Sequence, residues 1–131
     1  MTLKALSTKY YEFLGKLYQN IDSDSIKWTK AVNAEYYSAE IDYKFNIRIS
    51  MSIAGLTKNY YFRMFDDAST RIIEMTTEEN GQDKIEVDGT VYTVKTILEE
   101  IYEWAKAYSM DIIGKIEKAS DLLDEIKKGR L

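Results

Sequence analysis

The stretch IDYKFNIRISMSI, from Ile41 to Ile53, places an apolar side chain at every second position. Because successive side chains of a strand point to opposite faces of a sheet, this alternation predicts one β-strand with a buried face and a solvated face. The stretch is about twice as long as a usual strand, so we expect it to twist, bend or carry a bulge. It therefore indicates a sheet that is covered on one side.

Shorter alternating runs follow the long one, at residues 60–65, 70–77, 84–87 and 90–94. Two dipeptides between them, Asn80-Gly81 and Asp88-Gly89, favour two-residue hairpin turns. Such turns need positive φ at both central residues, which Asn, Asp and Gly tolerate best. The middle of the chain thus predicts an antiparallel β-meander of four to five strands.

Helical periodicity flanks the meander on both sides. Apolar residues recur at steps of three and four in the first twenty-one positions, at Leu3, Leu6, Tyr10, Phe13, Leu14, Leu17 and Ile21. This spacing is typical of one face of an amphipathic helix. After the meander, Thr96 and Glu99 match a capping box at the start of a second apolar stripe, over residues 98–126. An unbroken helix over residues 96–128 would be about 50 Å long, so we expect it to break near residues 109–114 or to project beyond the sheet.

Together these patterns predict a single α+β domain over residues 1–131, with a long C-terminal helix packed on the sheet. Residues 26–39 fit the spacing of a strand and of a helix, and both assignments stay open. The C-terminal stripe is similar to a coiled-coil seam, except for two consecutive steps of four at Tyr108, Ile112 and Ile116. Packing against the sheet is favoured over homodimerisation through this helix.

Several residue types are absent from the chain, which has no His and no Cys among 131 residues. This removes the commonest zinc ligands, the commonest general base and the best nucleophile. Glycine-rich phosphate-binding motifs are missing too. We therefore expect no catalytic site, no metal and no cofactor. The lack of Cys fits a reducing cytoplasm, and no stretch of roughly 20 apolar residues predicts a membrane span.

Charge is distributed unevenly along the chain, whose formal net charge is −4. Residues 66–103 contain eleven acidic side chains and three basic ones. This segment could present a negative face to a partner with a basic surface. Alternatively, its charges are solvated and keep the edge of the meander from pairing with other chains. The sequence leaves both interpretations open.

Tyrosine is abundant, with eleven residues that include three adjacent pairs, Tyr10-Tyr11, Tyr36-Tyr37 and Tyr60-Tyr61. When two adjacent tyrosines lie on one strand, one ring enters the core while the other faces solvent. Exposed Tyr is favoured at protein interfaces because it offers a large contact area with little rotamer entropy to lose. Nearby Lys and Arg side chains suggest a stacking platform for nucleic acid, but the negative net charge argues against one.

These features favour a non-enzymatic protein-binding module, of the inhibitor or immunity type. The composition resembles that of accessory proteins of phages and other mobile elements, without a matching motif. The residues predicted to contact the partner combine two rings with five carboxylates: Tyr60, Tyr61, Asp66, Asp67, Glu78, Glu79 and Asp83. One alternative is a homo-oligomeric structural or chaperone-like component that assembles through the C-terminal helix. The other is a small-molecule carrier or enzyme with a pocket between sheet and helix.

Overall fold

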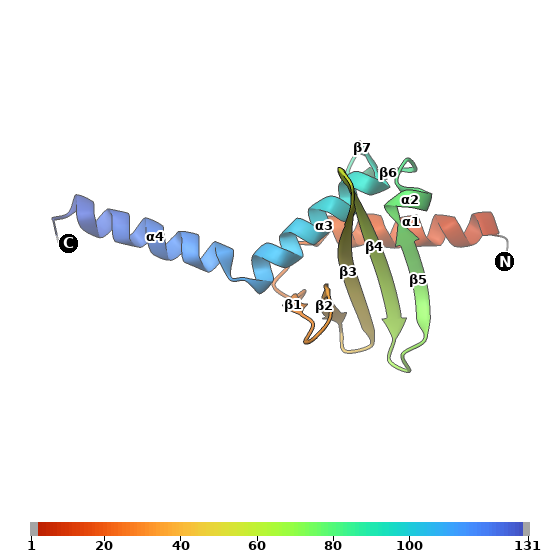
Figure 1. Cartoon of the computed structure of the whole chain (residues 1–131), viewed down its shortest axis with the longest axis horizontal. Helices are drawn as coiled ribbons and strands as arrows, with labels where there is room; N and C mark the ends of the chain where they lie inside the picture. The colour runs from red at the N-terminus through yellow and green to blue at the C-terminus, as the bar shows by residue number, and fades with distance from the viewer. Residues whose placement is uncertain (1–2, 130–131) are drawn as a thin grey trace.

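The computed structural model describes residues 3–129, and its centre is a five-stranded antiparallel sheet (Figure 1). The strand order is β1-β2-β3-β4-β5, so each strand pairs with its neighbours in sequence. The strands are β1 (Thr29–Lys30), β2 (Tyr36–Ile41), β3 (Phe45–Ala54), β4 (Thr57–Asp66) and β5 (Arg71–Thr76). With helices before and after this meander, the predicted α+β fold class is confirmed.

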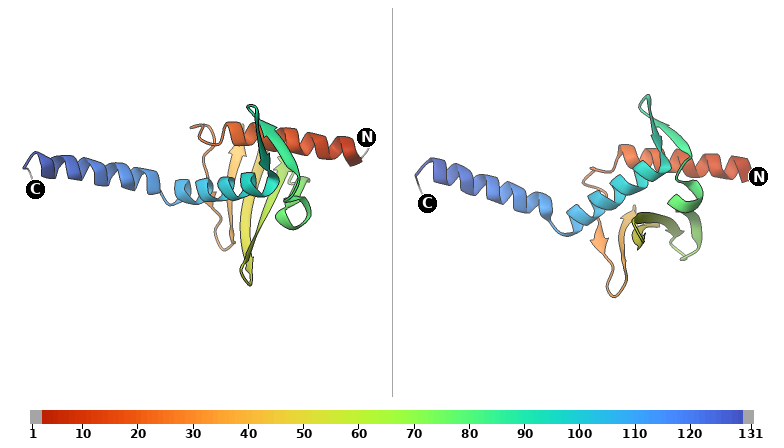
Figure 2. Two further views of the ribbon diagram at one scale, coloured as in Figure 1. Left: turned by 90° about the horizontal axis from the view of Figure 1, so that it is seen from above. Right: turned by 45° about the horizontal axis from the view of Figure 1, so that its top comes forward.

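Helices α1 (Leu3–Gln19) and α3 (Val94–Ser109) cover the same face of the sheet (Figure 2). Between β5 and α3 lie the one-turn helix α2 (Thr77–Asn80) and a hairpin, formed by β6 (Lys84–Val87) and β7 (Thr90–Thr93). This hairpin is a separate two-stranded sheet that packs against α1. The last helix is α4 (Ile112–Lys127). None of the described helices is both long enough and apolar enough to cross a bilayer.

The core lies between the helices and the inner face of the sheet. Its central apolar residues come from β3, β4, α1 and α3, and include Ile47, Ile49, Phe62, Leu14, Ile97, Leu98 and Ile101. Three tyrosine rings join β2, β4 and α3, because Tyr102 packs against Tyr37 and Tyr60 with centroids 5.5 and 5.6 Å apart. Such tilted ring pairs add to the stabilisation from apolar burial.

The prediction of one strand over residues 41–53 is wrong, because the chain turns between β2 and β3. Asp42 and Tyr43 adopt positive φ values of 52° and 58°, and Ile41 pairs directly with Phe45. Three residues separate this pair, so the apolar side chains keep the same odd-numbered positions before and after the turn. The alternation therefore hides the turn. Tyr43, at its tip, is 90% exposed.

The open segment at residues 26–39 contains no helix in the structure. Trp28 is buried at its start, β1 follows as a two-residue strand, and β2 begins at Tyr36. The strand assignment is therefore correct for residues 29–30 and 36–39, while Ile26 and Trp28 lie in the loop before β1.

One of the two predicted hairpin dipeptides forms a hairpin turn and the other does not. Asp88 and Gly89 have φ of 52° and 81° and join β6 to β7, as predicted. Asn80-Gly81 instead ends α2, where Gly81 has a φ of −59°. The competing signal is an N-cap, because the Thr76 hydroxyl accepts a hydrogen bond from the Glu79 N–H at 3.2 Å. Gly is needed at position 81 because a Cβ there would collide with the Thr77 carbonyl.

The long C-terminal helix is broken, as one of the two predictions for it required. Asp111 has a positive φ of 52° between α3 and α4. Of the two helices that the break separates, α3 packs on the sheet and α4 extends away from it (Figures 1 and 2). The predicted capping box is wrong, because α3 begins at Val94 and its cap is Thr93, whose hydroxyl accepts from the Thr96 N–H.

Two tyrosines fasten α1 to the second half of the chain. The Tyr18 hydroxyl donates to Glu100 on α3, and the Tyr11 hydroxyl donates to Asp83 in the loop before β6. Partial burial raises the pKa of Tyr18 above its usual value of 10.0, and the Glu100 carboxylate raises it further. Both effects favour the protonated phenol in the folded state.

We expect Tyr18 to make the fold sensitive to alkali. Because its pKa is higher in the folded chain than in the unfolded chain, its contribution is complete below pH 10 and is lost as pH rises through the folded value. As the pH is raised above 10, the stability of Tyr18→Phe should therefore fall less than that of the wild type. The urea midpoint of unfolding, measured across a pH series, gives this stability. Tyr43→Phe, which changes an exposed ring, is the control. Parallel pH profiles for wild type and Tyr18→Phe would contradict this linkage.

Candidate functional site

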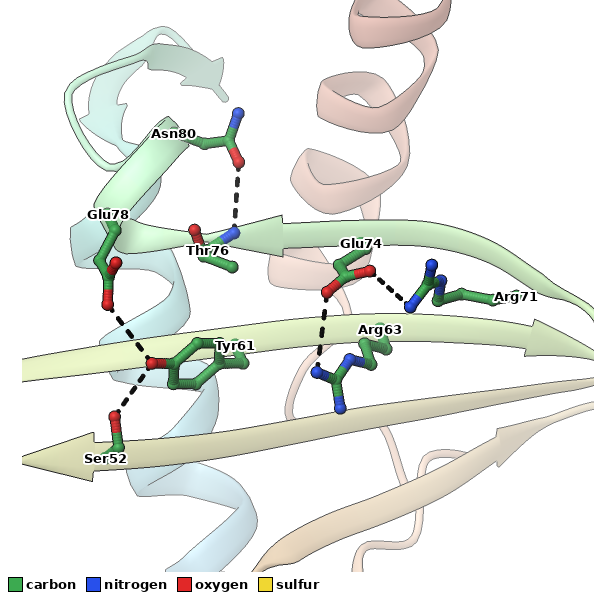
Figure 3. A network of polar contacts seen from close by, with 8 residues as sticks. All are labelled: Ser52, Tyr61, Arg63, Arg71, Glu74, Thr76, Glu78 and Asn80. Atoms are coloured by element: carbon green, nitrogen blue, oxygen red, sulfur yellow. Dashed lines mark hydrogen bonds and ion pairs between the residues drawn. The ribbon is translucent and has the colours of Figure 1, made fainter.

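The seven residues predicted to contact a partner do not form one surface. Tyr61 points away from the helices, and its hydroxyl lies 3.1 Å from the Ser52 hydroxyl and 3.4 Å from a Glu78 carboxylate oxygen (Figure 3). Asp66 and Asp67 lie at the opposite end of β4, about 17 Å along the strand from Tyr61. The acidic side chains are therefore divided between the two ends of the sheet.

Tyr60 is buried, with 1% of its surface exposed, and offers no area to a partner. Its ring packs against Tyr102 on the inner face of the sheet. Burial raises the pKa of Tyr60, with a further contribution from the Glu99 and Glu103 carboxylates. The prediction of a surface contact at Tyr60 is thus corrected, because inward and outward positions alternate and Tyr61 is the outward member of the pair.

Two of the predicted carboxylates accept hydrogen bonds that hold nearby parts of the chain in place. One Asp66 carboxylate oxygen accepts hydrogen bonds from the N–H groups of Ala68 and Thr70, at 3.0 and 2.8 Å, within the turn between β4 and β5. Asp83 accepts from the Tyr11 hydroxyl, which in turn accepts from the Asn80 side-chain amide. These contacts give Asp66 and Asp83 a structural role, whereas Asp67 and the α2 residues Glu78 and Glu79 are exposed.

The outer face of the sheet brings cations and aromatic rings together, the combination for which the sequence suggested a stacking platform. The Arg48 guanidinium lies 4.9 Å from the centre of the Tyr36 ring and 4.3 Å from that of Phe65. Beside it, Glu74 pairs with Arg71 at 2.7 Å and with Arg63 at 3.7 Å (Figure 3). Alternate positions on neighbouring strands could have indicated this arrangement once the register was known.

A groove of about 1370 Å³ lies between α1, the loop at residues 23–27 and β2. We call it the α1–β2 groove. Its apolar lining comes from Phe13 and Leu17 on α1, Ile26 in the loop, and Ala39 and Ile41 on β2. The groove exists because α1 leans toward β6 and Phe62, which leaves the β2 end of the sheet's inner face less covered.

One edge of β2 is unpaired where it borders this groove. Strand β1 has only two residues, and its pairing with β2 is limited to Tyr37 and Ser38. Residues 39–41 therefore have β3 on one side and no strand on the other. An unpaired strand edge exposes backbone donors and acceptors that an added strand can bind. Sequence analysis missed this feature because residues 26–39 were not assigned.

Charged side chains also line the groove: Lys9, Glu12, Lys16, Asp24, Lys27, Glu40 and Asp42. Lys9 pairs with Glu12 at 3.7 Å on α1, and Lys44 pairs with Asp42 at 3.9 Å in the turn between β2 and β3. Over residues 3–129, the structure holds no group of three or more Asp or Glu side chains placed to bind a metal ion.

A smaller hollow of about 510 Å³ lies along the solvent face of α3, where Trp104 is flanked by Glu99, Glu100 and Glu103. Because α3 begins at Val94, these acids lie beyond its first turn. They make this face of α3 acidic.

Comparison with known proteins does not extend these observations. No family model, no curated protein and no solved structure matches the chain.

Proposed function

We propose that the protein is a non-enzymatic protein-binding module that holds an extended segment of a partner protein in the α1–β2 groove. The observation that carries this proposal is an apolar groove beside an unpaired strand edge. Addition of a peptide strand to a sheet edge uses main-chain hydrogen bonds for affinity and side-chain pockets for specificity.

The register of β2 indicates which backbone groups the partner would use. The Tyr36 carbonyl accepts a hydrogen bond from the Ala31 N–H at 2.9 Å, so Tyr36 faces the β1 side. Alternate residues of an antiparallel strand face the same edge, which places the N–H and C=O of Glu40 on that side too. Because β1 does not extend to Glu40, these two groups are available to an incoming strand.

The side chains of the groove favour a peptide with alternating apolar residues. Phe13 and Leu17 form one wall and Ile41 forms part of the other. In an added strand, every second side chain would point toward these walls. The volume of about 1370 Å³ is larger than most small-molecule pockets, which measure roughly 300–1,000 Å³. This supports a chain segment over the alternative of a small-molecule carrier.

Glu40→Pro should weaken this binding, because it removes the outward amide while proline is tolerated at a free strand edge. Twelve-residue peptides selected from a random display library would serve as the probe. We expect enriched sequences to alternate apolar and polar residues and to bind Glu40→Pro about tenfold more weakly in calorimetry, the equivalent of one or two lost hydrogen bonds. Glu40→Ala, which keeps the amide, is the matched control.

Two results would count against the groove as the binding site. One is equal affinity of the selected peptides for wild type and for Glu40→Pro, provided that circular dichroism shows both to be folded. The other is an NMR titration in which the Glu40 amide signal is unaffected by peptides that bind.

The inhibitor or immunity-type role expected from the sequence is a second proposal, supported by one cluster. Glu78 contacts Tyr61 at the α2 end of the sheet, and Glu79 and Asp83 supply two further exposed carboxylates close by in the chain. A partner with a basic surface would be attracted to these carboxylates before docking, which speeds association more than it strengthens the complex.

Charge reversal separates this electrostatic role from a purely structural one. The double variant Glu78→Lys/Glu79→Lys should slow association with a partner recovered by pull-down, by about fivefold or more at low salt, and should flatten the salt dependence of the rate. Asp67→Lys, at the other end of the sheet, is the matched control. Association rates that do not differ among the three proteins would remove the electrostatic argument.

A further inference from the structure

Helix α4 exposes an apolar stripe that the rest of the chain leaves uncovered. The helix makes its main contacts with α3 at its start and then extends away from the body (Figure 1). Along it, Ile116, Leu123 and Ile126 are 61%, 65% and 54% exposed, and Leu122 beside them is also exposed. A helix of this length is only marginally stable in water without packing, so an apolar partner would stabilise it.

The spacing of this stripe is that of a two-stranded coiled coil. Steps of four and three connect Ile112, Ile116, Ala119, Leu123 and Ile126, which is the spacing of alternating a and d core positions. The irregular consecutive steps of four seen in the sequence include Tyr108, which belongs to α3 and lies before the break at Asp111. Within α4 alone the seam is regular.

We propose that α4 pairs with α4 of a second copy of this chain as an antiparallel two-stranded coiled coil. A stripe with this spacing is complementary to itself when one helix is reversed, because each a position then meets a d position. Ile116 would pack against Ile126 of the second copy, and Ala119 against Leu123. This pairing is independent of peptide binding in the α1–β2 groove, which lies on the body.

Charge along α4 favours the antiparallel orientation. Residues 112–119 contain two lysines and one glutamate, so this half has a net charge of +1, whereas residues 120–127 contain three carboxylates and one lysine, a net charge of −2. These charges lie mostly away from the seam, so they act at long range: a parallel pair would set each half beside the same half of the second copy, while an antiparallel pair sets the positive half beside the negative half. Lys127 and Lys115 occupy opposite flanks of the seam, so reversal of one helix does not bring them together.

The shape of the molecule also fits this orientation. Because α4 points away from the sheet (Figure 2), an antiparallel pair places the two bodies at opposite ends of the coiled coil, about 24 Å apart along its axis. Leu122, which flanks the seam near its midpoint, would meet Leu122 of the second copy. The paired length lies at the small end of stable interfaces, so we expect a dissociation constant on the order of 1–100 μM.

The oligomeric state of the full chain tests the pairing. Sedimentation equilibrium should show a reversible monomer–dimer equilibrium, and Leu123→Asp should shift its dissociation constant at least about tenfold by placing a charge in the seam. Asp121→Asn, which removes one outward charge of the same helix and leaves the seam intact, is the control and should shift the dissociation constant by less than about twofold. A monomer at all concentrations up to roughly ten times the expected constant would overturn the proposal.

Cysteine cross-linking tests the orientation, since the natural chain contains no Cys. We expect an equimolar mixture of Ile116→Cys and Ile126→Cys to form a disulfide-linked heterodimer under oxidising conditions, because an antiparallel pair brings these two positions together. Each variant alone should form at least about tenfold less linked dimer, since like positions meet only in a parallel pair. Efficient self-linking of either single variant would overturn the antiparallel arrangement.

Discussion

Burial of the inner face of the antiparallel sheet under α1 and α3 is the constraint on which the rest of the structure depends. Ile47, Ile49 and Phe62 line this face, and Leu98 and Ile101 of α3 are fully buried in the same core. Side chains of this size stabilise the fold by roughly 1.5–3 kcal/mol each when they leave water. Helices α1 and α3 cover most of this face, and only its β2 end stays open, where it forms one wall of the α1–β2 groove.

Three parts of the molecule remain open once the core has formed: the α1–β2 groove, the outer face of the sheet and α4. Each stays open because α1 and α3 together cover only part of the sheet. Helix α1 packs toward β6, so the β2 edge is left bare. The outer face has no helix, and Arg48 is held there between two rings. Helix α4 contacts α3 at its start and then continues past the sheet.

Several local predictions failed where a tertiary or a competing local signal was stronger than the pattern. The turn at Asp42–Lys44 leaves the apolar side chains at odd-numbered positions on both sides of it, so the sequence pattern is the same with and without the turn. At Asn80-Gly81 the Thr76 cap turned the chain into a helix instead of a hairpin. The predicted partner surface failed for a related reason, because Tyr60 and Tyr61 point to opposite faces and the acids Asp66 and Glu78 lie at opposite sheet ends.

Local patterns were enough to establish the α+β class, the flanking helices and the Asp88-Gly89 hairpin, since each depends on neighbouring residues. The sequence left open whether the C-terminal helix breaks near residues 109–114 or continues unbroken past the sheet. The pairing of strands, the direction in which α1 leans and the exposure of α4 depend on contacts between distant residues, which no local pattern encodes. The α1–β2 groove is of this second kind. Its walls come from α1 and from β2, and they meet only after the sheet and helices have packed around the common core.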